Sequence, residues 1–346
     1  MDYYFPGLID TLKIPHNKEL LKHTVNSGEN AVRLILRIFG LQPTDKVAVP
    51  LFVCDSLKNA VIKEGLQPLY LDIKENNYWT NYDLEQIKKQ GTKAVILVHL
   101  YGFIYPDTNL VSKFCQENGV FLIHDMAQCY GADESLLTFG SIIYSFGPGK
   151  STTAAGGGLI KAIDDRFYKG QVNNPSRWAN IKSNLFLKSR IYGYEFSIVD
   201  KVWQALLSRC ALGKSIECMN STQKDTAEYV IGIVKDKTKP RKERYELLLN
   251  SVSDNPELAI AYDDNDGLYF KCVINVKGDV KRLKAYLAVN HVPFFSLFDS
   301  ITIGTNETAD KPMFILNAKR FIELSTEASI PISEVKRVGE VLAKYR

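Results

Sequence analysis

Two stretches of the chain place reactive side chains directly after apolar runs. The run VFLIHDMAQ at 120–128 puts Asp125 where a buried strand should end, and the run SIIYSFGPGKSTTAAGGG at 141–158 carries Ser145 and Lys150 on a glycine-containing loop. A carboxylate at such a place is costly to bury unless a cation or strong hydrogen-bond donors meet it. A lysine that is desolvated can form a Schiff base with a carbonyl group. The plainer alternatives are an aspartate that caps the next turn and an exposed loop lysine.

A third stretch, Asn26 to Gly28, immediately precedes a helical pattern. Backbone N–H groups at a helix start, together with the hydroxyl of Ser27, can hold an anion such as a phosphate. The alternative is an ordinary N-cap. Glu29 favours the cap, because it suits the helix dipole but would repel a bound phosphate.

The letters GPGKST also suggest a nucleotide-triphosphate loop, but the pattern fails at two points. The pattern requires glycine at position 144, where this chain has Tyr144. A helix should follow such a loop, whereas TTAAGGGLI indicates a turn that leads into a strand. We therefore reject a P-loop.

The elements that must position these residues alternate between helical periodicity and short apolar runs from residue 29 to about 162. This alternation predicts a doubly wound α/β domain with a largely parallel sheet covered on both faces. In such sheets ligands bind beyond the carboxyl ends of the strands, where the reactive residues fall. The predicted helices cover 29–39, 56–64, 83–90 and 108–118, and the predicted strands cover 47–50, 68–72, 94–98, 120–124, 141–146 and 158–162.

The second half of the chain predicts helices and then a smaller α/β part. Residues 180–234 combine helical patterns with aromatic side chains, which we interpret as helix packing or a subunit interface rather than a membrane surface. The run KDKTKPRKER at 235–244 predicts a solvated basic hinge. These features divide the chain into a large domain, 1–235, and a small C-terminal domain, 236–346. Helices are expected at 242–252, 278–290 and 333–345, and strands at 258–263 and 268–276. The aromatic residues include Tyr192, Tyr194, Phe196 and Trp203.

Composition narrows the class of protein. The chain is 45% hydrophobic and 24% charged, which excludes a disordered or low-complexity protein. A net charge of +4 gives little support for a nucleic-acid partner and suits a phosphorylated small molecule equally well. The six cysteines and five histidines show no metal-binding spacing, so we expect no metal site and no disulfide framework. No leader or apolar run long enough for a membrane span is expected, and the predicted location is the cytoplasm.

In their order and spacing, these segments resemble the DegT/DnrJ/EryC1/StrS family, the fold type I aminotransferases that use pyridoxal 5'-phosphate (PLP) and act on nucleotide-linked keto sugars. The resemblance covers most of residues 24–165 and extends weakly to the closing segment ASIPISEVKRVGEVLAKY. It implies a fold type I large domain with a mainly parallel sheet, followed by a smaller α/β domain. The segments that carry it are NSGENAVRLIL, LQPTDKVAVP, GLQPLYLDI, VHLYG, HDMAQ and YSFGPGK.

The resemblance also assigns roles to individual residues. Lys150 would form the Schiff base with PLP and shuttle the proton, and Asp125 would pair with the pyridine nitrogen. Gln128 would lie near the phenolic oxygen of the cofactor. The remaining cofactor-binding residues, which would hold its phosphate, are Ser145, Ser27 and Gly28.

Three departures from the family pattern stand out. Glu29 replaces a small hydroxyl residue, and Cys54 replaces the aromatic ring that many members stack on the cofactor, so that a sulfur contact would take its place. The segment through which one subunit reaches the phosphate of the other has no clear match, although Asn173, Asn174 and Arg177 are candidates.

The predicted function is an aminotransferase that moves an amino group from an amino acid, with glutamate as the first choice, to a nucleotide-linked keto sugar. Such a reaction serves amino-sugar or cell-surface polysaccharide biosynthesis. The alternatives are a non-catalytic or regulatory relative, and another PLP chemistry on an amino acid. The resemblance implies a homodimer.

Overall fold

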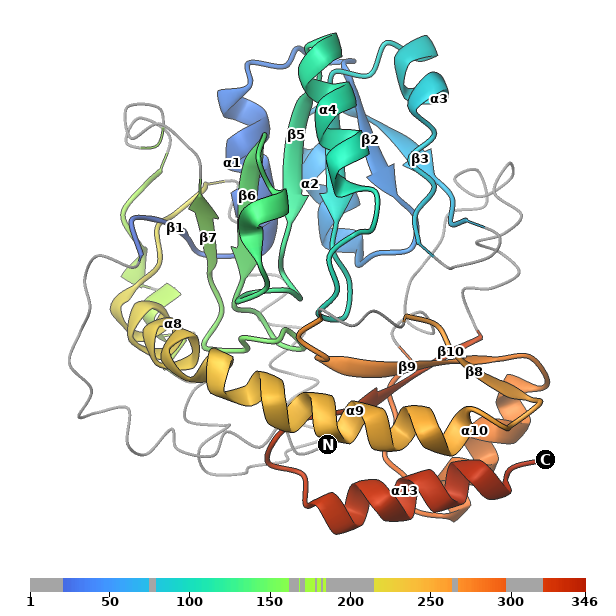
Figure 1. Cartoon of the computed structure of the whole chain (residues 1–346). Helices are drawn as coiled ribbons and strands as arrows, with labels where there is room; N and C mark the ends of the chain where they lie inside the picture. The colour runs from blue at the N-terminus through green and yellow to red at the C-terminus, as the bar shows by residue number, and fades with distance from the viewer. Residues whose placement is uncertain are drawn as a thin grey trace.

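Two sheets and the helices around them make up the protein. The computed structural model describes residues 21–74, 79–161, 168, 172–177, 179–181, 183–184, 215–262, 267–296 and 320–346. A seven-stranded sheet occupies the first part of these residues and a three-stranded sheet the last part. Figure 1 shows the smaller sheet beneath one end of the larger one, with helices on its far side.

The large sheet has the order β1-β7-β6-β5-β4-β2-β3. Strands β2 to β6 pair in parallel, whereas β7 is antiparallel to both β6 and β1. The chain leaves β3 and crosses back to β4 on the other side of β2, so the strand order reverses between β2 and β4. The strands are β1 (His23–Val25), β2 (Lys46–Pro50), β3 (Gln67–Leu71), β4 (Ala94–Val98), β5 (Phe121–Asp125), β6 (Ser141–Ser145) and β7 (Gly158–Lys161).

The central strands form because their side chains are apolar on both faces. All five residues of β4, AVILV, are buried, as expected for a sheet covered on each side. The covering helices are α1 (Gly28–Ile38), α2 (Asp55–Lys63), α3 (Leu84–Lys89) and α4 (Thr108–Asn118), with the short helix η2 (Glu134–Leu136) after β5. Helix α4 ends at Gly119, whose φ of +62° suits glycine. The predicted α/β domain and its four helices are therefore confirmed.

The second sheet is antiparallel and has the order β10-β9-β8. Its strands are β8 (Leu258–Ile260), β9 (Lys271–Val276) and β10 (Phe321–Ser325), of which β10 was not predicted from the sequence. Helix α9 packs along α13 on the outer side of this sheet (Figure 1). The described helices of this half are α8 (Ser221–Val234), η3 (Lys235–Lys237), α9 (Thr238–Val252), α10 (Val280–Val289) and α13 (Ile332–Lys344).

The expectation of a solvated basic hinge at 235–244 is wrong. Helices α8, η3 and α9 follow one another through this run. Arg241 is fully buried and Arg244 is nearly so, because each guanidinium binds groups of the three-stranded sheet with its helices and turns, which we call the small part. Two of the basic charges therefore hold the fold together instead of facing water. The division of the chain at residue 235 stays a prediction.

Helix α8 confirms the helical pattern in the last part of 180–234. The aromatic residues Tyr192, Tyr194, Phe196 and Trp203 lie outside the described residues, as does residue 162 of the last predicted strand. Within the part of the chain that the structure describes, no helix has both the length and the apolar character needed to cross a membrane.

Candidate active site

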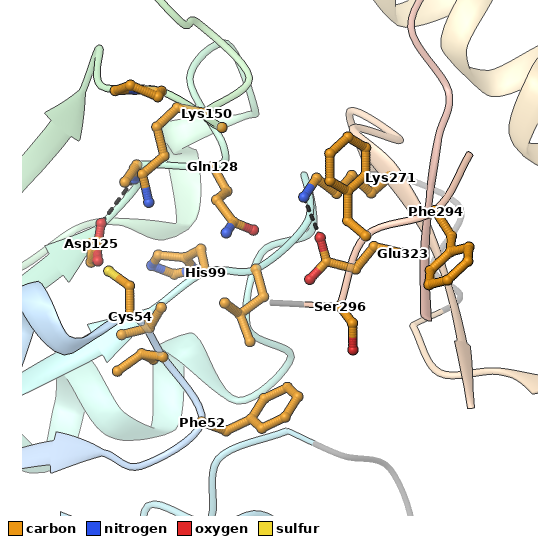
Figure 2. A pocket seen from close by; sticks show the side chains of 17 residues that line it. Phe52, Cys54, His99, Asp125, Gln128, Lys150, Lys271, Phe294, Ser296 and Glu323 are labelled. Carbon is orange, nitrogen blue, oxygen red and sulfur yellow. Dashed lines mark hydrogen bonds and ion pairs between the residues drawn. The ribbon is translucent and has the colours of Figure 1, made fainter. Parts of the chain in front are cut away.

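A cavity of about 610 Å³ opens where the parallel strands of the large sheet end. Its walls come from the segments after β2 and β4, on either side of the point where the strand order reverses, and from the ends of β5 and β6. Such a reversal is the usual ligand position in doubly wound sheets. The small part supplies the opposite wall (Figure 2). The lining residues are Phe52, Val53, Cys54, Val98, His99, Leu100, Asp125, Ala127, Gln128, Pro148, Gly149, Lys150, Lys271, Phe294, Phe295, Ser296 and Glu323.

Asp125 is the last residue of β5, and its side chain is buried beside the cavity. Its Oδ1 accepts a hydrogen bond of 2.9 Å from the N–H of Ala127. Burial raises the pKa of Asp125, while the positive charge of Lys150 and the Ala127 N–H oppose that rise. A cationic group that reached this carboxylate would therefore be stabilised.

Lys150 lies on the loop between β6 and β7 and points into the cavity on the side of Asp125 (Figure 2). Thr153 fixes the lysine backbone from both sides. The N–H of Lys150 donates to Thr153 Oγ1 at 2.9 Å, and the same hydroxyl donates to the Lys150 carbonyl at 2.7 Å. The sequence therefore builds a small closed turn that presents one half-buried amine to the cavity.

Gln128 lines the cavity three residues after Asp125. Its Oε1 accepts a 2.7 Å hydrogen bond from the N–H of Tyr101, in the turn that follows β4. This bond fixes the orientation of the amide, and Figure 2 shows the amide nitrogen on the side of Lys150. Tyr101 itself has a φ of +56°, an uncommon conformation for a bulky residue that this turn imposes.

Ser27, Gly28 and Ser145 pack against one another but do not line the cavity. Ser27 caps α1, since its Oγ accepts from the N–H of Asn30 at 3.1 Å. A Cβ atom added to Gly28 would lie 2.7 Å from the Cβ of Ser145 and 2.8 Å from its Oγ. Only glycine therefore lets the helix start approach the end of β6. The hydroxyl of Ser145 accepts a long bond of 3.4 Å from the N–H of Gly147.

Glu29 and Cys54, the two site residues that depart from the family pattern, lie in different places in the structure. Glu29 turns away from the start of α1, because its carboxylate pairs with Lys63 Nζ of α2 at 2.5 Å. Cys54 lines the cavity as predicted for a cofactor contact, and its Sγ lies 2.7 Å from Ser56 Oγ. The candidates Asn173, Asn174 and Arg177 are exposed and outside the lining.

A buried histidine pair, His99 with His124, was not identified in the sequence analysis, and His99 lines the cavity. His99 Nδ1 accepts from the N–H of Tyr105 at 3.0 Å, so its proton is on Nε2, which is 3.2 Å from Nδ1 of His124. The Nε2 of His124 then donates to the Phe139 carbonyl at 2.9 Å. Burial holds the pKa of His99 well below its usual value and lowers the pKa of His124 to about 4, so both rings are neutral.

The small part contributes a buried ion pair, Lys271 with Glu323, which was also missed. Lys271 begins β9 and Glu323 is the middle residue of β10. Glu323 lies inside the otherwise mostly apolar run FIELS. Because charged side chains are seldom fully buried unless they are paired, this glutamate was a signal in the sequence for a functional residue. Among the described residues, no group of three His, Cys, Asp or Glu side chains is arranged to hold a metal ion.

Comparison with known proteins decides the family. The sequence model of the DegT/DnrJ/EryC1/StrS aminotransferase family matches residues 19–298, which is most of the chain. The chain belongs to this family. Family membership confirms the predicted cofactor, because these aminotransferases depend on PLP.

Among curated members, the UDP-N-acetyl-3-dehydro-alpha-D-glucosamine 3-aminotransferase of Acidithiobacillus ferrooxidans is 35% identical to this chain over 159 residues. The alignment covers 43% of each protein, so the chain matches less than half the length of this curated relative by sequence.

Solved structures of the family share the fold over nearly the whole chain. A DegT/DnrJ/EryC1/StrS aminotransferase from Brucella abortus superposes with a TM-score of 0.70 at 17% identity, covering 97% of this chain and 89% of that one. The ntda protein of Bacillus subtilis, solved with bound cofactor PMP, gives a TM-score of 0.67 at 19% identity, covering 92% and 72%. The predicted fold type I architecture is thereby confirmed.

Proposed function

We propose that this protein is a PLP-dependent aminotransferase that transfers an amino group from an amino acid to a nucleotide-linked keto sugar. Glutamate is the first candidate for the donor, and amino-sugar or cell-surface polysaccharide biosynthesis is the proposed purpose. The observation that carries the proposal is the position of Lys150 and Asp125 in one cavity at the carboxyl ends of the strands. The name of the Acidithiobacillus relative supports a nucleotide sugar as the substrate class.

The residues present fit the cofactor. Ser27, Gly28 and Ser145 lie outside the cavity lining and Ser27 caps α1, but the absence of a side chain at Gly28 keeps this helix start open, and we propose that its N–H groups and the two serine hydroxyls hold the phosphate. Asp125 would pair with the protonated pyridine nitrogen. Burial raises the pKa of this carboxyl and the charge of Lys150 offsets that rise only in part, so a further cation would stabilise the carboxylate. Gln128 would donate its amide to the phenolic oxygen, and Cys54 would contact the ring.

When bound, PLP supplies an electron-accepting ring and a carbonyl carbon that receives the amino group. The side chains of the protein have to hold the cofactor and move the protons. Lys150 Nζ would hold the cofactor between turnovers and would move the proton to and from the reacting carbon. Asp125 keeps a proton on the ring nitrogen, which keeps the ring electron-poor. Phe52 and Leu100 add apolar surface to the cavity wall, which would limit the access of water when substrate is bound.

Lys150→Ala tests this assignment. The wild-type protein should show a visible absorption band with PLP, and adding glutamate should convert that band to the absorption of the amine form. The variant should show neither the band of lysine-bound cofactor nor the conversion, because the amine that binds the cofactor and moves the proton is missing. A matched control is Lys113→Ala, whose lysine is exposed on α4 and should behave as wild type.

The same spectra separate the alternatives. A wild-type protein that binds PLP but converts with no amino donor would contradict the aminotransferase and favour a regulatory relative. Conversion that releases a product other than a keto acid and an amino sugar would indicate another PLP chemistry on an amino acid. Product analysis with panels of keto sugars and amino acids distinguishes these outcomes.

The proposal includes a homodimer in the cytoplasm. Exposed Asn173, Asn174 and Arg177 are the residues we propose to reach the phosphate of the second subunit. The described cysteines are all free thiols, which suits a reducing compartment. Sedimentation of the PLP-loaded protein should give twice the mass of the chain. A monomer that binds PLP at full strength would contradict the dimer.

A further inference from the structure

The ion pair on the small-part wall is more deeply buried than a surface salt bridge. The side chain of Lys271 is 13% exposed and that of Glu323 only 1% exposed. Tyr101 fixes the carboxylate from the other side, since its hydroxyl donates to Glu323 Oε1 at 3.2 Å. The Lys271 ammonium also lies 5.2 Å from the ring centre of Phe295 and 5.5 Å from that of Phe270. Figure 2 shows the pair across the cavity from Lys150.

A buried pair of this kind is weak evidence for a structural role. Taking two charges out of water costs about as much as their attraction returns, and apolar residues of similar volume often stabilise as well. The pair also lines the cavity, next to Phe295. The charges therefore indicate a ligand.

Under the proposed function, the cavity has few charges left for substrate. Its described lining has two ammonium groups, Lys150 and Lys271, and two carboxylates, Asp125 and Glu323. Lys150 and Asp125 are committed to the cofactor. Lys271 is then the cation in this lining that an anionic substrate group can meet.

The two substrates of an aminotransferase impose opposite demands on that cation. An amino-acid donor brings an α-carboxylate to the reacting carbon, whereas the reacting ring of a keto sugar carries no charge. A buried ammonium without a partner would be costly while the sugar is bound. Lysine has a flexible stem and three rotatable donors, so it can exchange partners, whereas Glu323 is held in place by Tyr101.

We propose that Lys271 is the binding residue for the α-carboxylate of the amino donor, and that Glu323 is its resident counter-ion. Lys271 leaves Glu323 for the carboxylate when the donor enters and returns to it when the keto sugar occupies the cavity. This inference rests on the proposed function and adds to it a means by which one cavity accepts first a substrate with a charge next to the reacting carbon and then a substrate whose reacting ring is uncharged.

Separate half-reactions with Lys271→Met test the proposal. The concentration of glutamate for half-maximal conversion should rise at least about tenfold, because a charge-assisted hydrogen bond to the carboxylate is lost. The reaction of the amine form with the keto sugar should lose clearly less than the donor reaction, because Glu323 then lacks its cation but keeps the hydrogen bond from Tyr101. Lys271→Arg keeps the charge and should retain most of the donor reaction. The control is Lys277→Met, since Lys277 is exposed just beyond the other end of β9.

Glu323→Gln tests the counter-ion separately. The donor reaction should survive or gain in affinity, because Lys271 no longer has a competing carboxylate. The keto-sugar half-reaction should slow at least about tenfold, because the ammonium is then buried without a charged partner. Equal losses in both half-reactions for Lys271→Met, or an unchanged donor reaction, would overturn the proposal.

A binding measurement distinguishes failure of this inference from failure of the proposed function. Glutarate has carboxylates but no amino group, so it cannot react. Calorimetry with the PLP-loaded wild type should detect glutarate, and Lys271→Met should weaken that binding at least about tenfold. If the wild type converts with no amino acid, the proposed function fails while this titration still decides the role of Lys271. Equal glutarate affinity in the two proteins would overturn that role.

Discussion

At the scale of single residues, the missing side chain of Gly28 is a tight constraint on the site. The start of α1 and the end of β6 approach so closely that a methyl group at position 28 would collide with Ser145. Both contacting atoms, Cβ and Oγ of Ser145, belong to a short side chain that is itself buried. Relief therefore requires movement of the backbone on one side or the other.

Gly28→Ala should lower the free energy of unfolding by about 1–3 kcal/mol, the usual cost of overpacking, and should weaken PLP binding. Urea denaturation and a PLP titration measure the two effects. Gly232→Ala is the control, because Gly232 is an exposed residue of α8 whose added Cβ would meet nothing within 4 Å. It should stabilise the protein by about 0.5–1 kcal/mol.

A second substitution shows whether the collision is the cause. Ser145→Gly removes the atoms that an alanine at position 28 would meet, so the double variant should recover stability relative to Gly28→Ala alone. Stability that does not recover would mean that the constraint at Gly28 comes from something other than Ser145.

Some site residues could be predicted from the sequence because they follow directly on apolar runs. Asp125 and Lys150 are of this kind, and both line the cavity, as do Gln128 and Cys54. Lys271 and Glu323 could not be found in this way. They are 52 residues apart and meet only because β9 pairs with β10, a contact that no local pattern contains.

At the scale of elements, the ends of β4 and β5 are joined by more than strand pairing. The N–H of His99 donates to the Asp125 carbonyl at 3.1 Å, and the histidine pair continues this connection through side chains. Each ring nitrogen of the pair has a defined role, which requires both rings to be neutral. A proton added to either ring would break the chain of hydrogen bonds.

Stability should therefore fall as the pH falls from about 6.5 to about 4. The folded-state pKa of His124 is lowered to about 4, below the unfolded value of 6.5, so the unfolded chain binds more protons in this window. This difference of about 2.5 pKa units corresponds to about 3 kcal/mol of folding stability. The protein has this stability in full above pH 6.5 and loses it as the pH falls toward 4. Because carboxylates titrate nearby, the informative quantity is the difference between wild type and His124→Gln.

The variant should lose about 3 kcal/mol less than wild type between pH 6.5 and 4, as measured by urea denaturation at several pH values. Measurements at pH 8, where the imidazole is neutral in both states, give the cost of the substitution itself. Parallel pH curves for the two proteins would contradict the neutral buried pair.

Element prediction succeeded where strands are continuously apolar and failed where they are not. Strand β4 was expected because all of its residues are hydrophobic, and β5 and β6 because each contains three consecutive hydrophobic residues, FLI and IIY. Strand β10 was missed because Glu323 interrupts FIELS and breaks both the continuous and the alternating pattern. The residues 235–244 suggested a hinge because sequence does not reveal that Arg241 and Arg244 find buried partners.

At the scale of the whole molecule, Arg241 joins the active-site loop to the small part. Its guanidinium donates to the carbonyl of Ser151, the residue after Lys150, at 3.3 Å and pairs with Glu327 beyond β10. Among the described residues, the Nε and Nη1 atoms of Arg241 have no hydrogen-bond partner. The arginine therefore depends heavily on these two contacts.

Arg241→Met should lower the free energy of unfolding by about 3 kcal/mol, because hydrogen bonds of a buried charge are lost and the Ser151 carbonyl is left without its donor. Urea denaturation measures the change. Lys113→Met, which removes an exposed pair with Glu117 on α4, should change the stability by less than about 0.5 kcal/mol. A loss below about 1 kcal/mol for Arg241→Met would show that the contacts are replaceable.

The bond between Tyr101 and Glu323 also has a consequence for synthesis of the protein, since the two residues are 222 positions apart. At roughly 5–20 residues per second, a ribosome needs about 10 to 45 s to reach Glu323 after making Tyr101. For most of that interval the turn after β4 lacks the backbone of Leu268 and Phe270, whose N–H groups bond to it at 2.7 and 3.0 Å in the finished fold. The turn after β4 thus stays without these contacts while more than 160 further residues are made, and chaperones that bind incomplete folds have that long to act.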